Sequence, residues 1–122
     1  MYKAKLLHNG SRIRKLRAEL RPRVARALSR RTRQAAGIAY QLCPVSDNDE
    51  PGHVHTRDTI AVESNARGDV QKLVAGGASL FLEFGTVHMD AQPFLRPAVA
   101  EVKPELMKDL RRILRHYGYS VD

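Results

Sequence analysis

The sequence predicts a single α+β domain over residues 1–122. We expect an antiparallel sheet of about three to four strands, packed with a long N-terminal amphipathic helix and a C-terminal helix. Apolar residues recur at helical spacing over residues 22–42 and again over 97–114. Between these ranges, short alternating stretches are separated by glycine-containing turns. The order of helices, strands and a final helix is typical of the α+β class, and the length suits one domain.

The N-terminal region is predicted to begin with an extension over residues 1–10. Asn9 and Ser11 are candidate N-caps, because their short polar side chains can accept hydrogen bonds from the first N–H groups of a helix. They predict a short first helix over residues 12–20.

Pro22 then predicts a stop or a kink, because proline lacks the backbone N–H and disfavours a helical residue before it. Proline suits the first turn of a helix, so the main helix is expected over residues 22–42 and is ended by Pro44. Its apolar stripe comprises Val24, Ala27, Leu28, Ala35, Ile38, Ala39 and Leu42. Its opposite face carries Arg23, Arg26, Arg30 and Arg33.

The middle of the chain predicts a loop followed by strands. Residues 46–57 are polar and contain a Pro-Gly turn. Alternating stretches over residues 59–64 and 69–76 predict two strands joined by a hairpin turn, in which a glycine is free to adopt positive φ. The stretch ASLFLEFG, residues 78–85, predicts a third strand with Glu83 pointing outward.

After Gly85 the chain is expected to leave the sheet. Pro97 is placed to open the last helix, whereas Pro104 predicts a kink or a late start. Pro93 and Pro97 stiffen the connecting arm, so little entropy is lost when it docks. Phe94 and Leu95 supply apolar anchors, either for the protein's own core or for a neighbouring subunit.

The charge is strongly polarised along the chain. The net charge is +8, but residues 1–40 hold twelve Lys and Arg against one acid, Glu19, whereas residues 41–100 carry a balance of −4. This distribution predicts an anionic partner, either nucleic acid or an acidic protein surface, or pairing between copies of the chain. The candidate face for that partner is Arg23, Arg26, Arg30 and Arg33.

The sequence indicates no catalytic or metal centre. His53 and His55, with Cys43, Asp47 and Asp49 upstream, match no established zinc spacing and favour a solvated loop. A nucleophile elbow, a phosphate loop and a dinucleotide fingerprint are all missing. A single cysteine excludes an internal disulfide framework. With no apolar stretch of membrane-spanning length and no signal peptide pattern, we expect a soluble intracellular protein without cofactors.

Two motifs near the C-terminus resemble the signature of a family of tailed-bacteriophage neck and tail-completion proteins, first defined in a lambda-like coliphage. The family's Glu-Phe-Gly-Thr corresponds to Glu83, Phe84, Gly85 and Thr86. Its Gln-Pro-Phe-Leu-Arg-Pro-Ala corresponds to Gln92, Pro93, Phe94, Leu95, Arg96, Pro97 and Ala98. Upstream, Cys43-Pro44-Val45 stands where the family has Ala-Pro-Val, and residues 56–60 stand where it has Leu-Arg-x-Ser-Ile. The family's Asp-Thr-Gly has no counterpart. The resemblance covers most of residues 11–114.

The resemblance implies a structural virion protein without enzymatic activity or cofactor, made in the bacterial host cytoplasm and located at the neck or tail junction of the virion. It implies a homo-oligomeric ring, with a hexamer favoured and a dodecamer as the alternative. Its partners would be neighbouring neck, portal-adaptor or tail-terminator proteins, with non-specific contact to DNA in the channel and none to a membrane. The motif residues from Glu83 to Thr86 and from Pro93 to Pro97 would form the interface. The alternative, which charge alone supports, is a basic nucleic-acid-binding protein.

Overall fold

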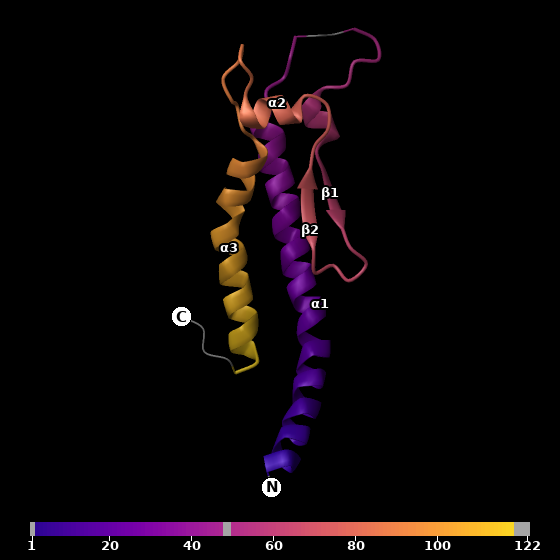
Figure 1. Cartoon of the computed structure of the whole chain (residues 1–122), viewed down its shortest axis with the longest axis vertical. Helices are drawn as coiled ribbons and strands as arrows, with labels where there is room; N and C mark the ends of the chain where they lie inside the picture. The colour runs from indigo at the N-terminus through magenta and orange to yellow at the C-terminus, as the bar shows by residue number, and fades with distance from the viewer. Residues whose placement is uncertain (1, 48–49, 119–122) are drawn as a thin grey trace.

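The computed structural model describes residues 2–47 and 50–118, with side chains from residue 12 onward. The elements in order are α1 (Tyr2–Leu42), the 3-10 turn η1 (Thr56–Thr59), β1 (Ala61–Ser64), β2 (Gln71–Val74), α2 (Ser79–Phe84) and α3 (Leu95–His116). The α+β class is therefore confirmed. In Figure 1, α1 runs the length of the molecule, with α3 antiparallel on one side and the β-hairpin on another. The short α2 crosses the end where α1 finishes and α3 begins (Figure 1).

The predicted break at Pro22 is wrong, because α1 is one helix of 41 residues that includes this proline. Asn9 and Ser11 consequently lie inside the helix rather than at a start, and residues 2–10 are helical. A proline inside a helix removes one hydrogen bond and costs about 3 kcal/mol. Pro22 is exposed, so water can reach the carbonyl that loses its partner, and good helix formers continue on both sides. The predicted end before Pro44 is confirmed.

The C-terminal helix α3 is also continuous through its prolines. It begins at Leu95, so Pro97 lies in the first turn, where no N–H is needed. Pro104 lies inside the helix on an exposed face, and the predicted late start at this residue is wrong. The helix instead buries Ala98 and Val102 on the side that faces α1.

The predicted hairpin is confirmed. β1 and β2 pair antiparallel, with Val62 opposite Leu73. Gly68 in the connecting turn has φ 74°, as the turn requires, and a Cβ placed on it would lie 3.1 Å from the Cβ of Ala25. The turn therefore rests closely on α1, where a side chain larger than hydrogen would be crowded.

The predicted third strand is wrong, because residues 79–84 form α2 and the described residues contain a sheet of two strands. The apolar residues of this stretch are Leu80, Phe81, Leu82 and Phe84, and they follow neither a period of two nor a period of 3.6 clearly. Its residues are Ser, Leu, Phe and Glu, with none of the β-branched types that favour strands. The preceding Gly77 has φ 59°, which turns the chain away from the sheet.

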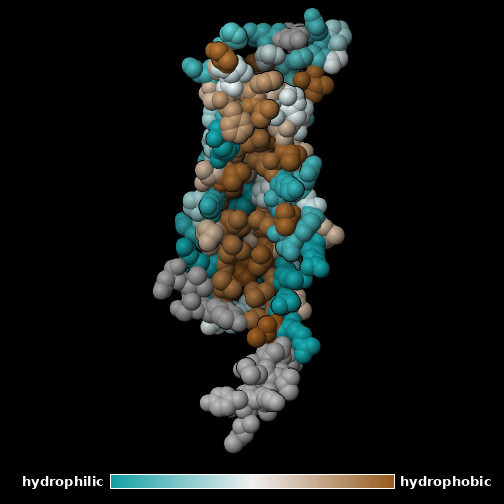
Figure 2. All heavy atoms as spheres, in the orientation of Figure 1, coloured by the Kyte–Doolittle hydropathy of each residue, from teal (hydrophilic) through white to brown (hydrophobic). Residues whose placement is uncertain are grey.

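The core lies where α1, α3 and the hairpin meet. Its buried residues are Ala35, Ala39, Cys43, Phe94, Ala98 and Val102, with Ile38, Ile60, Leu73, Ala75, Leu82 and Leu95 packed around them. Alanines on the facing sides of α1 and α3 allow close approach, and Phe94 is fully buried between them. Figure 2 shows further apolar side chains along the centre of one face, over α1 and the facing sides of α3 and the hairpin.

Candidate assembly interface

Glu83 connects α2 to the start of α3. Its carboxylate Oε1 accepts hydrogen bonds from the backbone N–H groups of Phe94 at 2.7 Å and Leu95 at 2.6 Å. These are donors at a helix start, which have no partner within the helix and carry its partial positive charge. Glu83 is 5% exposed, so the prediction of an outward strand residue is wrong. The side chain instead caps α3 from a different helix.

Arg96 completes this arrangement from the first turn of α3. Its Nε donates to Oε2 of Glu83 at 3.1 Å, and its Nη2 donates to the Glu83 carbonyl at 2.6 Å. Its guanidinium also lies over the ring of Phe84, 4.8 Å from the centroid. Burial by itself would raise the pKa of Glu83, but the hydrogen bonds from Leu95, Phe94 and Arg96 outweigh it and hold that pKa below its usual value. The charged form of Glu83 is therefore favoured by its hydrogen bonds to the start of α3.

Gly85 makes the turn out of α2 possible. It has φ 76°, and a Cβ placed there would lie 2.9 Å from both the Ala91 nitrogen and the Met89 oxygen. The chain folds back immediately, since Thr86 N–H donates to the Met89 carbonyl at 2.8 Å. Glycine is required here both by the backbone conformation and by the closeness of the returning chain.

The motif residues are thus brought together, but they divide into two groups. The buried or half-buried group comprises Glu83, Gly85, Phe94, Leu95 and Pro97. The exposed group comprises Phe84, Thr86, Pro93 and Arg96. The position of Phe94 decides between the two predicted roles of this anchor, because it fills the protein's own core. Much of the motif therefore builds the α2–α3 connection.

An exposed apolar surface remains on this connection. We call it the α2 patch, and it consists of Leu80, Phe81 and Phe84 on α2 and Val87 just beyond it. Their exposed fractions are 64%, 54%, 67% and 98%, respectively. Helical spacing places the first three beside one another on α2. Large apolar side chains gathered on a surface mark an interaction site more often than single exposed ones do.

The four arginines of the predicted anionic-partner face have different surroundings. Arg23, Arg26 and Arg33 are exposed, and the guanidinium of Arg23 lies 5.5 Å from the ring centroid of Tyr117. Arg30 is also largely exposed, yet its Nη2 lies 3.2 Å from the Asp109 carboxylate. Arg30 therefore also has a role within the fold.

Sequence reasoning missed the ion pair between Arg31 and Asp109, which connects α1 to α3. The guanidinium binds the carboxylate in two places, Nε to Oδ2 at 2.6 Å and Nη2 to Oδ1 at 3.1 Å. Asp109 is 2% exposed. The hydrogen bond from Arg31 holds the pKa of Asp109 below its usual value against the opposing effect of burial, and Arg30 adds to this. A signal was available, because each residue interrupts the apolar stripe of its helix.

The loop that contains His53 and His55 forms no metal centre within the described residues. The rings of His53 and His55 meet edge to face with centroids 4.9 Å apart. Within residues 2–47 and 50–118, no group of three or more His, Cys, Asp or Glu side chains is placed to hold a metal ion. Asp49, one of the predicted candidates, lies outside the described residues.

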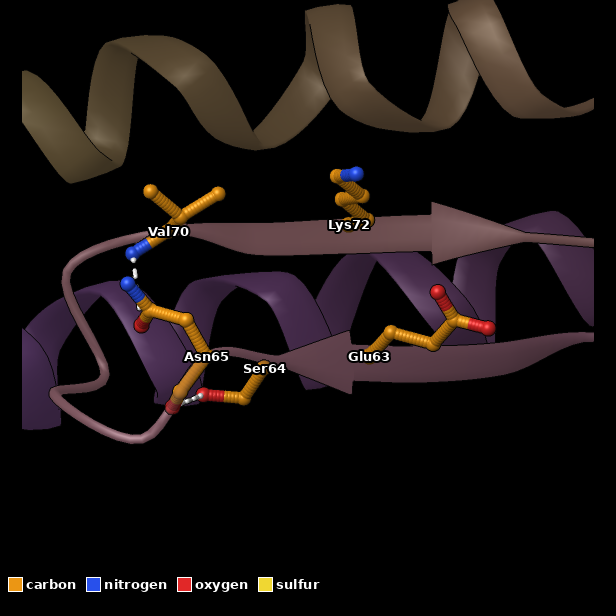
Figure 3. Close-up of a pocket in the computed structure, with 5 residues that line it drawn as sticks. All are labelled: Glu63, Ser64, Asn65, Val70 and Lys72. Atoms are coloured by element: carbon orange, nitrogen blue, oxygen red, sulfur yellow. Dashed lines mark hydrogen bonds between the residues drawn. The ribbon is translucent and has the colours of Figure 1, made fainter.

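A polar hollow lies on the hairpin (Figure 3). It is lined by Glu63, Ser64, Asn65, Val70 and Lys72. Asn65 Oδ1 accepts from Val70 N–H at 3.3 Å, and Ser64 Oγ donates to the Asn65 carbonyl at 3.0 Å. These contacts stabilise the turn of the hairpin, and the hollow is a local feature of that turn.

The described part of the chain contains no helix with an apolar stretch long enough to cross a membrane. Comparison of the chain with protein-family models, with curated proteins and with solved structures finds no match.

Proposed function

We propose that this protein is a structural subunit of a ring at the head–tail junction of a tailed phage or phage-like particle. In this role it joins the connector to the tail and performs no catalysis. Copies of the chain would form the ring, with a hexamer favoured, and neighbouring neck, portal-adaptor or tail-terminator proteins would contact its two faces. The protein would be made in the host cytoplasm and remain in the virion.

One observation carries the proposal. The two halves of the motif that resembles the tail-completion family are separated in sequence, yet they meet in one unit through Glu83, Phe94 and Arg96. Such a unit gives α2 a fixed orientation with its apolar patch exposed. A rigid element that presents apolar side chains loses little entropy on docking, which suits a permanent assembly.

Disruption of the gene in its own phage or prophage tests the proposal. Induced particles should accumulate as DNA-filled heads and separate tails in electron micrographs, and the chain supplied from a plasmid should restore complete particles. Purified wild-type particles should contain the chain at a fixed multiple, located at the junction. Complete particles formed in the absence of the chain would contradict the proposal.

A second candidate is a basic nucleic-acid-binding protein, and the exposed arginines on the N-terminal part of α1 favour it. Lys and Arg that neutralise phosphates release counterions, so affinity for free DNA would fall steeply with salt. Titration of duplex DNA at several salt concentrations measures this slope. A steep slope together with complete particles in the disrupted strain would favour this candidate over the ring subunit.

A further inference from the structure

The N-terminal end of α1 extends beyond the rest of the fold (Figure 1). With 41 residues, α1 is about 62 Å long, whereas α3 with 22 residues spans about 33 Å. The end of α3 is marked on α1 by Arg23, whose guanidinium lies over the ring of Tyr117. The cover of α1 by the rest of the fold therefore decreases along the residues before Arg23, and the start of α1 is uncovered.

The apolar stripe of α1 continues into this segment. Ile13, Leu16 and Leu20, which we call the α1 stripe, precede Val24 and the buried Ala27 at spacings of three and four residues. Ile13 is 55% exposed, and the other two are half-buried. In the body of the molecule the same side of α1 packs against α3 and the hairpin. The α1 stripe is thus an apolar surface that the described residues cover only in part.

The charges beside the α1 stripe restrict what can cover it. The exposed basic residues of this segment are Arg12, Arg14, Lys15, Arg17, Arg21 and Arg23, and Glu19 is the acid among them. The N-terminal end of a helix adds partial positive charge. Two such segments would repel one another, so a symmetrical contact between two α1 stripes is disfavoured. The stripe requires a surface that is both apolar and acidic.

The opposite end of the same molecule has these properties. Two exposed acids, Asp58 and Asp90, lie on segments that contact the two ends of α2. Asp58 is on η1, which meets the start of α2 through a hydrogen bond from Ala78 N–H to Thr56 Oγ1 at 3.3 Å. Asp90 follows Met89, whose carbonyl lies against Gly85 at the end of α2.

Few basic groups oppose these acids. Asp47 and Glu50 add exposed negative charge in the neighbouring loop. Of the bases nearby, Arg96 is paired with Glu83 and Arg57 stacks on Tyr40 with its guanidinium 5.0 Å from the ring centroid. The α2 end is thus apolar and acidic, and the uncovered end of α1 is apolar and basic.

We propose that the α1 stripe of one copy docks on the α2 patch of a second copy, with the flanking arginines and lysine beside Asp58 and Asp90. The contact joins unlike surfaces, so each chain keeps one free stripe and one free patch, and repetition gives a closed ring or a filament according to the rotation between neighbours. Apolar contact provides affinity, and the opposite charges fix the partner and the direction. This inference rests on the proposed function, since it supplies the contact between ring neighbours.

Two variants of the full chain test the contact. The stripe variant carries Ile13→Gln, Leu16→Gln and Leu20→Gln, which keep helix propensity, and the patch variant carries Leu80→Gln and Phe81→Gln. All five positions lie on exposed or half-exposed surface, so circular dichroism and thermal unfolding should match the wild type. The matched control is Val99→Gln, which is 47% exposed in the groove between β2 and α3.

Sedimentation velocity should show wild-type chains and the Val99→Gln control as oligomers. Each of the two variants should be monomeric, with association weakened about 100-fold or more, since each lost apolar contact contributes up to about a tenfold factor. The equimolar mixture of the two variants should form a dimer and nothing larger, because it retains one intact stripe and one intact patch. High salt should weaken this dimer.

Several outcomes would overturn the proposal. These are a mixture that stays monomeric, a stripe variant that assembles like the wild type, and a wild-type chain that does not associate. Loss of binding to duplex DNA or to anionic vesicles with unchanged self-association would assign the stripe to those ligands instead. A dimer in the mixture combined with complete particles in the gene disruption would leave the contact standing and remove the phage proposal. If the gene disruption gives separate heads and tails but the mixture of variants stays monomeric, the phage proposal would stand and the proposed contact would be removed.

Discussion

The α2–α3 connection and the N-terminal half of α1 use charged residues in opposite ways. In the connection, Glu83 and Arg96 bind each other and the start of α3. In the N-terminal half of α1, basic residues lie on the surface around an apolar stripe that the rest of the fold covers only in part. Charge by itself therefore does not identify an interaction surface in this molecule. The charged residues that hold this fold are grouped around the buried carboxylates Glu83 and Asp109, and those available to a partner lie at the two ends.

The largest expected effect separates two phenylalanines of the same connection. Phe94→Ala should lower the free energy of unfolding by about 3–5 kcal/mol, because it removes a fully buried ring from the core. Phe84→Ala should lower it by less than about 1 kcal/mol, since that ring is exposed and contributes mainly its contact with Arg96. Urea unfolding of both variants measures the difference. Equal losses would show that buried and exposed parts of the motif are not distinct.

The next effect concerns the ion pair between α1 and α3. Asp109→Asn should cost about 2–4 kcal/mol of unfolding free energy, because Arg31 is left beside a buried neutral group. Asp90→Asn is the matched control and should leave the urea midpoint unchanged, since Asp90 is exposed. Replacing the pair together, with Arg31→Met and Asp109→Leu, should recover much of the loss. If Asp90→Asn lowered the urea midpoint as much as Asp109→Asn does, the distinction between buried and surface charge would be wrong.

Acid should lower the stability of this fold largely through its two buried carboxylates, Glu83 and Asp109. The pKa values of Glu83 and Asp109 lie below their usual values, so the unfolded chain binds more protons than the folded chain as the solution is acidified. Their stabilisation is complete above the ordinary carboxyl pKa of about 4 and is lost as the pH falls through the lower folded values. Urea midpoints measured between neutral pH and pH 3 should therefore fall less in Glu83→Gln than in the wild type. The exposed control Glu63→Gln should follow the wild-type curve, and parallel curves for all three proteins would refute the assignment.

The smallest expected effect on stability comes from the arginine face. Arg23→Gln, Arg26→Gln and Arg33→Gln together should leave the urea midpoint close to that of the wild type, because these side chains are exposed. Arg30 is excluded from the set since it lies beside Asp109. Association of the chains at low salt should weaken. Substantial unfolding of this variant would place these arginines among the fold-forming charges.

The sequence predicted the elements whose pattern is unambiguous. The helical stripes over residues 22–42 and 97–114 and the hairpin with Gly68 at positive φ all correspond to observed elements. The helix α2 was missed because its apolar residues fit neither period clearly, so periodicity could not separate strand from helix. Pro22 failed as a stop signal because an exposed proline costs less than the strong helix formers around it contribute together.

The candidate site could be predicted in part. The motif identified the residues of the α2–α3 connection, but not that Glu83 faces inward, since its burial depends on the returning chain from Ala91 to Leu95. The same limit applies to Arg31 and Asp109, which sit on the apolar stripes of two helices far apart in sequence. A charged residue on each of two stripes is a pattern that could have been read as a buried pair. The complementarity of the two ends became visible only once their positions in space were known.

The central claim is that the α1 stripe of one copy lies on the α2 end of the next, and cross-linking tests it most directly. One chain carries Leu16→Cys and the other carries Phe81→Cys, and a short bismaleimide is added to their mixture. The native Cys43 is buried, and burial raises the pKa of its thiol, so it should react slowly. We predict cross-links between unlike chains in clear excess over links between like chains. Links equally common between like chains, or none at all, would contradict the account.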